Sequence, residues 1–232
     1  MMIDFEELHE KLFALQDFKY KNFKSKILPT VAKEKIIGIR SAELLKFTKD
    51  FFDDKTKTDF LNRLPHKYFE EDLIHVRIIS EMKNYDECID SIKSFLPYID
   101  NWAICDSLIP KIFSKHADKL VEEIKIWLSE DSTYTVRFAI SMLMKFYLND
   151  NFDKKYLQWV AAIRTNEYYI EMMAAWFFTE ALIKHYKEAI VFLQENLLPQ
   201  KIHAKTIQKA VESRRISDEQ KCYLKTLRRR NF

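Results

Sequence analysis

The chain has 232 residues and a net charge of +3, with 47% hydrophobic, 14% aromatic and 31% charged residues and a single glycine. This length gives room for a sizeable core, and the high apolar content excludes an intrinsically disordered chain. One glycine excludes phosphate-binding loops, dinucleotide-binding fingerprints and hairpins built on Asn-Gly or Asp-Gly turns.

Apolar residues recur at helical spacing over nearly the whole chain. The first predicted helix carries Phe5, Leu8, Leu12, Phe13 and Leu15. Ser41 is predicted to cap a helix that follows a turn at Gly38. Pro65 is predicted to end the helical stretch before it, and residues 68–82 are predicted to form the next helix. The further predicted helices are 84–95, 98–114, 117–128, 133–148, 153–163, 167–185, 187–195, 201–212 and 217–230. No segment alternates for long enough to predict a strand.

A dozen or so helices joined by short connections do not fit one four-helix bundle. Antiparallel helix pairs stacked in series would bury their apolar faces, and pairs recur about every 35–45 residues, the HEAT or armadillo period. We therefore expect an all-α fold, with a single domain over residues 1–232 that forms a right-handed α-solenoid with a concave groove. The alternative is a compact irregular helical domain. No run of about 18 apolar residues exists, so the sequence predicts no membrane span.

Positive charge gathers at the C-terminal end of the sequence. Residues 201–232 hold ten Lys and Arg and three Asp and Glu, a net +7, whereas the other 200 residues sum to −4. This asymmetry suggests a polyanionic partner such as nucleic acid. The alternative is a solvated C-terminal helix with a charged tail.

Trp102 and Asp106 lie four residues apart, so on a helix they share one face. Asp100 and Asn101 suit the N-terminal turn of that helix. A carboxylate beside a large apolar ring often marks a functional site, because such surroundings alter its ionisation. The alternative is a core tryptophan beside a surface acid.

Arg137 interrupts the strongly apolar predicted helix 133–148, so it must snorkel, pair with an acid or face a polar groove. Arginine suits bidentate phosphate recognition, and a structural ion pair with Asp106 is the alternative. Lys145 lies eight residues later and would extend a basic stripe. Trp176 lies among Met, Ala and Phe residues of the helix 167–185 and either belongs to the core or lines a groove.

The sequence contains no HExxH or CxxC motif and no EF-hand loop. The acidic residues Glu70, Glu71 and Asp72 indicate a solvated helix face more than a metal site. Three widely spaced cysteines indicate free thiols in a reducing cytoplasm rather than disulfides or a zinc site. The candidate site therefore consists of a carboxylate, two tryptophans and arginines, with no metal and no cofactor.

Six stretches carry a resemblance to a known family, and they occur in its order over most of the chain. They are IIGIRSAELL (36–45), LPHKYFEEDLIH (64–75), YIDNWAICDS (98–107), YTVRFAISML (134–143), YYIEMMAAWFFTEAL (168–182) and IHAKTIQKAVESRRI (202–216). The sequence resembles the HEAT-like-repeat DNA alkylation repair glycosylases of the AlkD type. In that family a Trp-x-x-x-Asp pair, an Arg on a later helix and a Trp further on line the catalytic cleft. The resemblance thus implies that Trp102, Asp106, Arg137 and Trp176 are catalytic.

The activity that the resemblance implies is base excision: hydrolysis of the N-glycosidic bond of positively charged N3- and N7-alkylated purines, without flipping the base into a deep pocket. A cationic base leaves as a neutral molecule, so one carboxylate suffices to stabilise an oxocarbenium-like sugar and position water. In this interpretation Asp106 performs both tasks and the tryptophans cradle the sugar and backbone around the lesion. Arg137 would hold a neighbouring phosphate and steady Asp106.

The expected partner is double-stranded DNA containing alkylated bases, which the basic C-terminal segment would contact through phosphates. The predicted DNA-binding residues are Arg137, Lys145, Lys205, Lys209, Arg214 and Arg215. We expect a monomeric cytoplasmic protein of a bacterium, associated with the nucleoid when bound to DNA. One alternative is a DNA-binding repeat protein that recognises damaged or branched DNA without excision. The other is a protein-interaction scaffold, which would not need Trp102 and Trp176.

Overall fold

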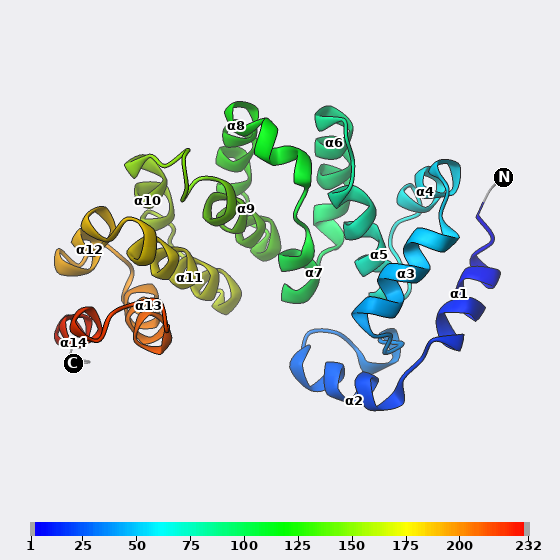
Figure 1. Ribbon diagram of the computed structural model, residues 1–232, viewed down its shortest axis with the longest axis horizontal. Coiled ribbons are helices and arrows are strands. Elements are labelled where there is room, and N and C mark those ends of the chain that lie inside the picture. The colour runs from blue at the N-terminus through cyan, green and yellow to red at the C-terminus, as the bar shows by residue number, and fades with distance from the viewer. Residues whose placement is uncertain (1–2, 230–232) are drawn as a thin grey trace. The chain divides into compact units, whose positions relative to one another are not determined.

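The computed structural model of the chain describes residues 3–229, so Arg230 of the basic segment lies outside the described residues. Over this range the structure has fourteen α-helices, three 3-10 helices and no strand (Figure 1), which confirms the predicted all-α class. None of these helices is long and apolar enough to cross a membrane. The chain divides into two compact units, Met1–Ile112 and Phe113–Phe232. The single domain and the solenoid stay predictions.

The N-terminal unit contains seven α-helices in its described residues. They are α1 (Phe5–Ala14), α2 (Phe18–Ile27), α3 (Ser41–Phe51), α4 (Asp54–Leu61), α5 (Phe69–Ser80), α6 (Tyr85–Phe95) and α7 (Trp102–Ser107), with the 3-10 helices η1 (Lys33–Lys35) and η2 (Leu96–Tyr98). Helix α5 packs against α3, α4, α6 and α7. Leu8 and Leu12 of α1 join a buried apolar cluster with Phe60 and Ile74. Burial of this apolar surface stabilises the unit.

The turn before α3 is built on Gly38 and a buried carboxylate. Gly38 has a positive φ of +95°, which a residue with a side chain rarely adopts. The Glu70 carboxylate accepts hydrogen bonds from the backbone N–H groups of Ile37 and Gly38, both at 2.8 Å, and of Ile39 at 3.2 Å. Burial raises the pKa of Glu70, and these three bonds oppose that shift. The predicted turn at Gly38 is therefore confirmed, and Glu70 fixes it.

Two local predictions in this unit are wrong. Ser41 does not cap α3: Arg40 occupies the N-cap position with an extended backbone and no side-chain cap bond, and the helix begins at Ser41 itself. The single helix predicted at 98–114 is broken into η2, α7 and η3 (Lys111–Lys115). Extended backbone at Asn101 and Leu108 bounds α7, and Pro110, which has no backbone N–H, prevents its continuation.

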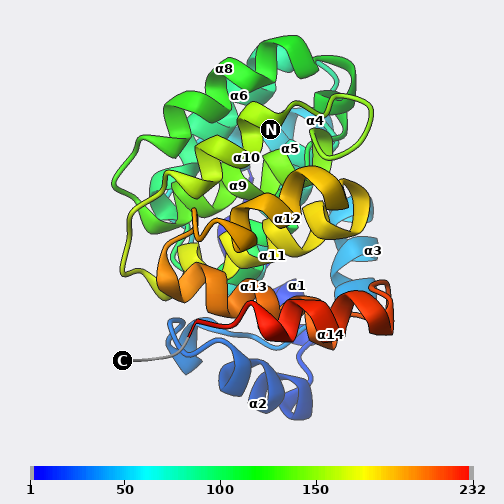
Figure 2. The same cartoon turned by 90° about the vertical axis from the view of Figure 1, so that its left-hand side faces the viewer.

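The helices of the C-terminal unit pack as neighbouring pairs. They are α8 (Ala117–Leu128), α9 (Thr133–Phe146), α10 (Lys154–Ala161), α11 (Tyr168–Lys184), α12 (Tyr186–Gln194), α13 (Gln200–Glu212) and α14 (Asp218–Thr226). Helices α9, α11 and α13 form a row, with α8 against α9, α10 and α12 against α11, and α14 against α13 (Figures 1 and 2). Stacked helix pairs of a repeat protein pack in this order.

Candidate functional site

Trp102 and Asp106 lie on one face of α7 in the N-terminal unit. The Asn101 side chain caps this helix by accepting hydrogen bonds from the N–H groups of the residues two and three positions later, at 3.1 and 3.0 Å. This confirms the predicted role of Asn101 at the helix start. The three residues between Trp102 and Asp106 are buried, whereas Trp102 and Asp106 themselves are half-buried. Both side chains therefore reach the surface of the unit from the same side of α7.

The Trp102 ring is held by a helix far away in the sequence. Its indole Nε1 donates a hydrogen bond to the carbonyl oxygen of Ile27, the last residue of α2, at 3.2 Å. Helix α2 has no buried residue of its own. It is held at its start by the Asp17 cap and by an ion pair of 2.8 Å between Arg40 and Asp17. The position of Trp102 thus depends on where the end of α2 lies.

The prediction of a solvated helix face at the start of α5 is wrong, because Glu70 and Glu71 are each only 1% exposed and the three acids have different roles. Glu70 binds the Gly38 turn, and Glu71 accepts hydrogen bonds from the backbone of Lys67 and Tyr68 at 3.0 and 2.7 Å. Asp72 is half-buried, and burial together with the charges of Asp100 and Glu71 raises its pKa to about 8. Over the described part of the chain no group of three or more His, Cys, Asp or Glu side chains could hold a metal ion.

Arg137 and Trp176 meet in the C-terminal unit, where α9 packs on α11. Arg137 is only 2% exposed, and its Nη1 donates a hydrogen bond of 2.7 Å to the carbonyl oxygen of Tyr169. The guanidinium carbon lies 5.4 Å from the centre of the Trp176 ring, within the range of a cation–π interaction. Trp176 is half-buried although its neighbours Ala175 and Phe177 are fully buried. The ring is therefore a surface residue of α11 rather than part of its core.

A group of charged residues lies one turn after Trp176. Glu180, four residues further along α11, is also half-buried and shares the side of the helix that carries Trp176. Both of its oxygens accept hydrogen bonds from Arg215, at 2.8 and 3.1 Å, and Lys184 lies 3.2 Å from it. Partial burial alone would raise the pKa of Glu180, but the bonds to Arg215 and Lys184 lower it below its usual value. Lys145 lines a hollow of about 230 Å³ beside Glu180 and Lys184.

The remaining predicted DNA-binding residues differ in whether their side chains already form hydrogen bonds or ion pairs. Arg214 is exposed, and in the range 3–229 no hydrogen bond or ion pair involves its side chain. Lys209 forms an ion pair of 3.1 Å with Glu212, and Lys205 donates a weak hydrogen bond of 3.4 Å to Gln208. Helix α13 therefore offers lysines whose existing partners are exposed and easily replaced.

The sequence matches the profile of the family described as DNA alkylation repair enzyme over residues 8–214. The chain belongs to this family. The match runs from α1 to the end of α13, so it includes both units and all four of the predicted catalytic residues. It confirms the family that the six sequence stretches indicate, and membership implies a DNA substrate. A comparison with curated proteins finds no match.

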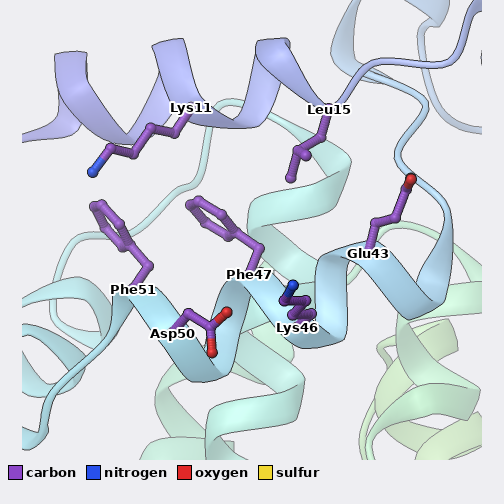
Figure 3. Close-up of a pocket in the computed structure, with 7 residues that line it drawn as sticks. All are labelled: Lys11, Leu15, Glu43, Lys46, Phe47, Asp50 and Phe51. Atoms are coloured by element: carbon purple, nitrogen blue, oxygen red, sulfur yellow. The ribbon is translucent and has the colours of Figure 1, made fainter.

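A pocket of about 500 Å³ lies between α1 and α3 (Figure 3). None of the predicted catalytic or DNA-binding residues lines it. Lys11 and Leu15 point from α1 toward Phe51 and Phe47 of α3. The Lys11 ammonium lies 4.9 Å from the centre of the Phe51 ring and forms an ion pair of 2.6 Å with Glu7. Two lysines and two acids line the pocket, so its formal charge is balanced. Nothing in its lining points to a charged substrate.

Proposed function

We propose that this member of the family is a monofunctional DNA glycosylase. It hydrolyses the N-glycosidic bond of positively charged N3- and N7-alkylated purines in duplex DNA. The observation that carries the proposal is the presentation of Trp102 and Asp106 on one half-buried face of α7, with the tryptophan anchored through its indole N–H. A carboxylate beside a fixed aromatic ring suits a reaction in which positive charge develops on a sugar.

In this mechanism the alkylated purine already carries a positive charge, so cleavage of its bond to C1′ releases a neutral base. The sugar takes up the positive charge as an oxocarbenium-like species. The Asp106 carboxylate stabilises that charge and accepts a proton from the water that attacks C1′. No proton has to be delivered to the leaving base, so one carboxylate performs the reaction.

The tryptophans and Arg137 bind rather than react. Trp102 and Trp176 present half-buried rings that contact the deoxyribose and the backbone beside the lesion. Arg137 keeps a charged group against the Trp176 ring, and a guanidinium is the side-chain group best suited to bind a phosphate oxygen. The protein acts as a monomer in this proposal, and uses neither a metal nor a cofactor.

The decisive experiment is the release of N3-methyladenine and N7-methylguanine from methylated duplex DNA by the wild type and by Asp106→Asn. We expect the wild type to release both bases and Asp106→Asn to be at least roughly 100-fold slower, because it loses the charge that stabilises the transition state. Asp118→Asn, which changes an exposed acid in the first turn of α8, is the matched control and should retain full activity.

Two outcomes would contradict the proposal in different ways. Equal rates for the wild type and Asp106→Asn would remove Asp106 from the reaction while leaving a glycosylase. No base release, together with salt-dependent DNA binding, would favour the alternative of a repeat protein that recognises damaged or branched DNA without excision.

A further inference from the structure

A second depression in the N-terminal unit, of about 580 Å³, lies among α3, α4, α5 and the segment after α7. This volume is in the range of small-ligand sites. The lining contains five Lys or Arg residues and two acidic residues, a formal excess of three positive charges. None of the residues predicted from the sequence for DNA binding belongs to it. In charge it differs from the balanced pocket between α1 and α3.

Both acidic residues of the depression are already paired. Lys57 lies 3.1 Å from Asp54, and Lys111 lies 2.5 Å from Glu81. The other three cations are Lys49, Arg77 and Lys83, and in the described residues no hydrogen bond or ion pair involves their side chains. Their charge is therefore available to an external anion.

The cations of the depression lie close together although they come from different elements. Lys111 lowers the pKa of Glu81 most strongly, through a hydrogen bond, and the charges of Lys83 and Lys49 lower it further. All three lysines therefore lie near one carboxylate. Arg77 of α5 lies one helical turn before Glu81 and is half-buried. Burial lowers the pKa of Arg77, and the charge of Glu81 opposes that shift. A partly desolvated guanidinium without a partner gains most from a bound anion.

The floor of the depression is apolar. Phe52 and Ile78 are buried at 5% and 7% exposure, and Leu45 at the rim is 37% exposed. Positive charges beside an apolar surface match the alternation of phosphate and deoxyribose along one DNA strand. The excess charge excludes an apolar ligand, because three unpaired cations would have to be desolvated.

We propose that this depression is a binding site for the sugar–phosphate backbone of DNA. Phosphate oxygens bind Arg77, Lys49 and Lys83, and a deoxyribose lies against the apolar floor next to Leu45. The inference rests on the proposed function for its choice of DNA as the ligand, and it adds phosphate contacts in the N-terminal unit. Such contacts position a protein on the duplex and carry no sequence information.

The test measures the affinity for a fluorescent 20-base-pair duplex between 50 and 200 mM salt, for Lys49→Gln, Arg77→Gln, Lys83→Gln and the triple variant. Each lost phosphate contact should reduce the slope of log K against log salt by about 0.9, which corresponds to roughly eightfold weaker binding at 0.1 M salt. Lys57→Gln is the matched control: it removes a lysine of the same depression that is paired with Asp54, and should leave the slope unchanged. Thermal melting establishes that each variant is folded.

A folded triple variant with the wild-type slope would overturn the inference. Stabilisation by inorganic phosphate alone, or by an acidic peptide, with an unchanged DNA slope would likewise overturn the assignment to DNA. The test also separates this inference from the proposed function. A reduced slope in a protein that releases no base supports the depression and rejects the glycosylase. Base release with an unchanged slope supports the glycosylase and rejects the depression as a DNA-binding site.

Discussion

The indole nitrogen of Trp102 donates a hydrogen bond to the carbonyl oxygen of Ile27, 75 residues earlier in the chain, at 3.2 Å. This bond joins a half-buried aromatic residue of the candidate site to the end of α2, a helix that contributes nothing to the core. A side chain that must meet its substrate in one orientation needs such support, because its exposed part makes few packing contacts.

Replacement of Trp102 by Phe should uncouple the ring from α2. We expect a loss of about 1 kcal/mol of stability, the usual value of one hydrogen bond, and faster hydrogen exchange in α2. Base release should slow by roughly tenfold or more, because a misplaced binding group costs orientation. Trp159→Phe on α10 is the control, since Trp159 has no proposed role. Unchanged exchange in α2 and unchanged base release would show that the bond does not position Trp102.

Replacement of Glu180 by Gln should strengthen DNA binding. The substitution removes the carboxylate that holds Arg215 and Lys184 and so releases two cations beside Trp176. The slope of log K against log salt should steepen by about 1 for each cation that gains a phosphate. Glu195→Gln, at the exposed end of α12, is the control. If affinity and slope stay at wild-type values in Glu180→Gln, the charged group after Trp176 does not face DNA.

Gly38→Ala should destabilise the N-terminal unit strongly. An added Cβ would lie 2.6 Å from Cβ of Lys21 and 2.8 Å from the backbone oxygen of Asp17, and the φ of +95° disfavours any side chain. We expect a loss of roughly 2 kcal/mol or more in chemical denaturation. Ser41→Ala, close by, should change stability by no more than about 0.5 kcal/mol, because Ser41 does not cap α3. A large effect of Ser41→Ala would contradict the assignment of Arg40 as N-cap.

The buried histidine pair should make stability fall in acid. Nε2 of His66 lies 2.8 Å from Nδ1 of His75, and burial lowers the pKa of His66 to about 4 and of His75 to about 2. As pH falls from 6.5 toward 4, the unfolded chain binds a proton on each ring and the folded chain does not. Folding therefore loses about 1.4 kcal/mol per pH unit for each histidine.

Denaturation at a series of pH values from 7 to 4.5 checks this prediction. In His75→Gln the loss of stability per pH unit should be smaller than in the wild type by about 1.4 kcal/mol, because one histidine fewer takes up a proton on unfolding. A variant that loses stability in acid as steeply as the wild type would show that His75 is protonated in the folded protein.

The sequence by itself determined the helical class, the family and the candidate residues. Apolar periodicity at a spacing of three and four residues identifies helices wherever one face is buried, and α6 and α8 show it clearly. The Trp102–Asp106 spacing placed both side chains on one helix face because the α-helix has 3.6 residues per turn. Helix α2 was not predicted, because it buries no residue and four of its ten residues are lysines.

Only the tertiary structure decided which partners these residues have. The bond from Trp102 to Ile27, the bidentate pair of Arg215 with Glu180, and the contact of Arg137 with Trp176 all join residues at least 35 positions apart. No local pattern encodes such pairs, because they depend on how the helices pack. The same holds for the cations of the second depression, which are scattered in the sequence from Lys49 to Lys111. Packing brings them together, and hydrogen bonding then determines which of them remain free.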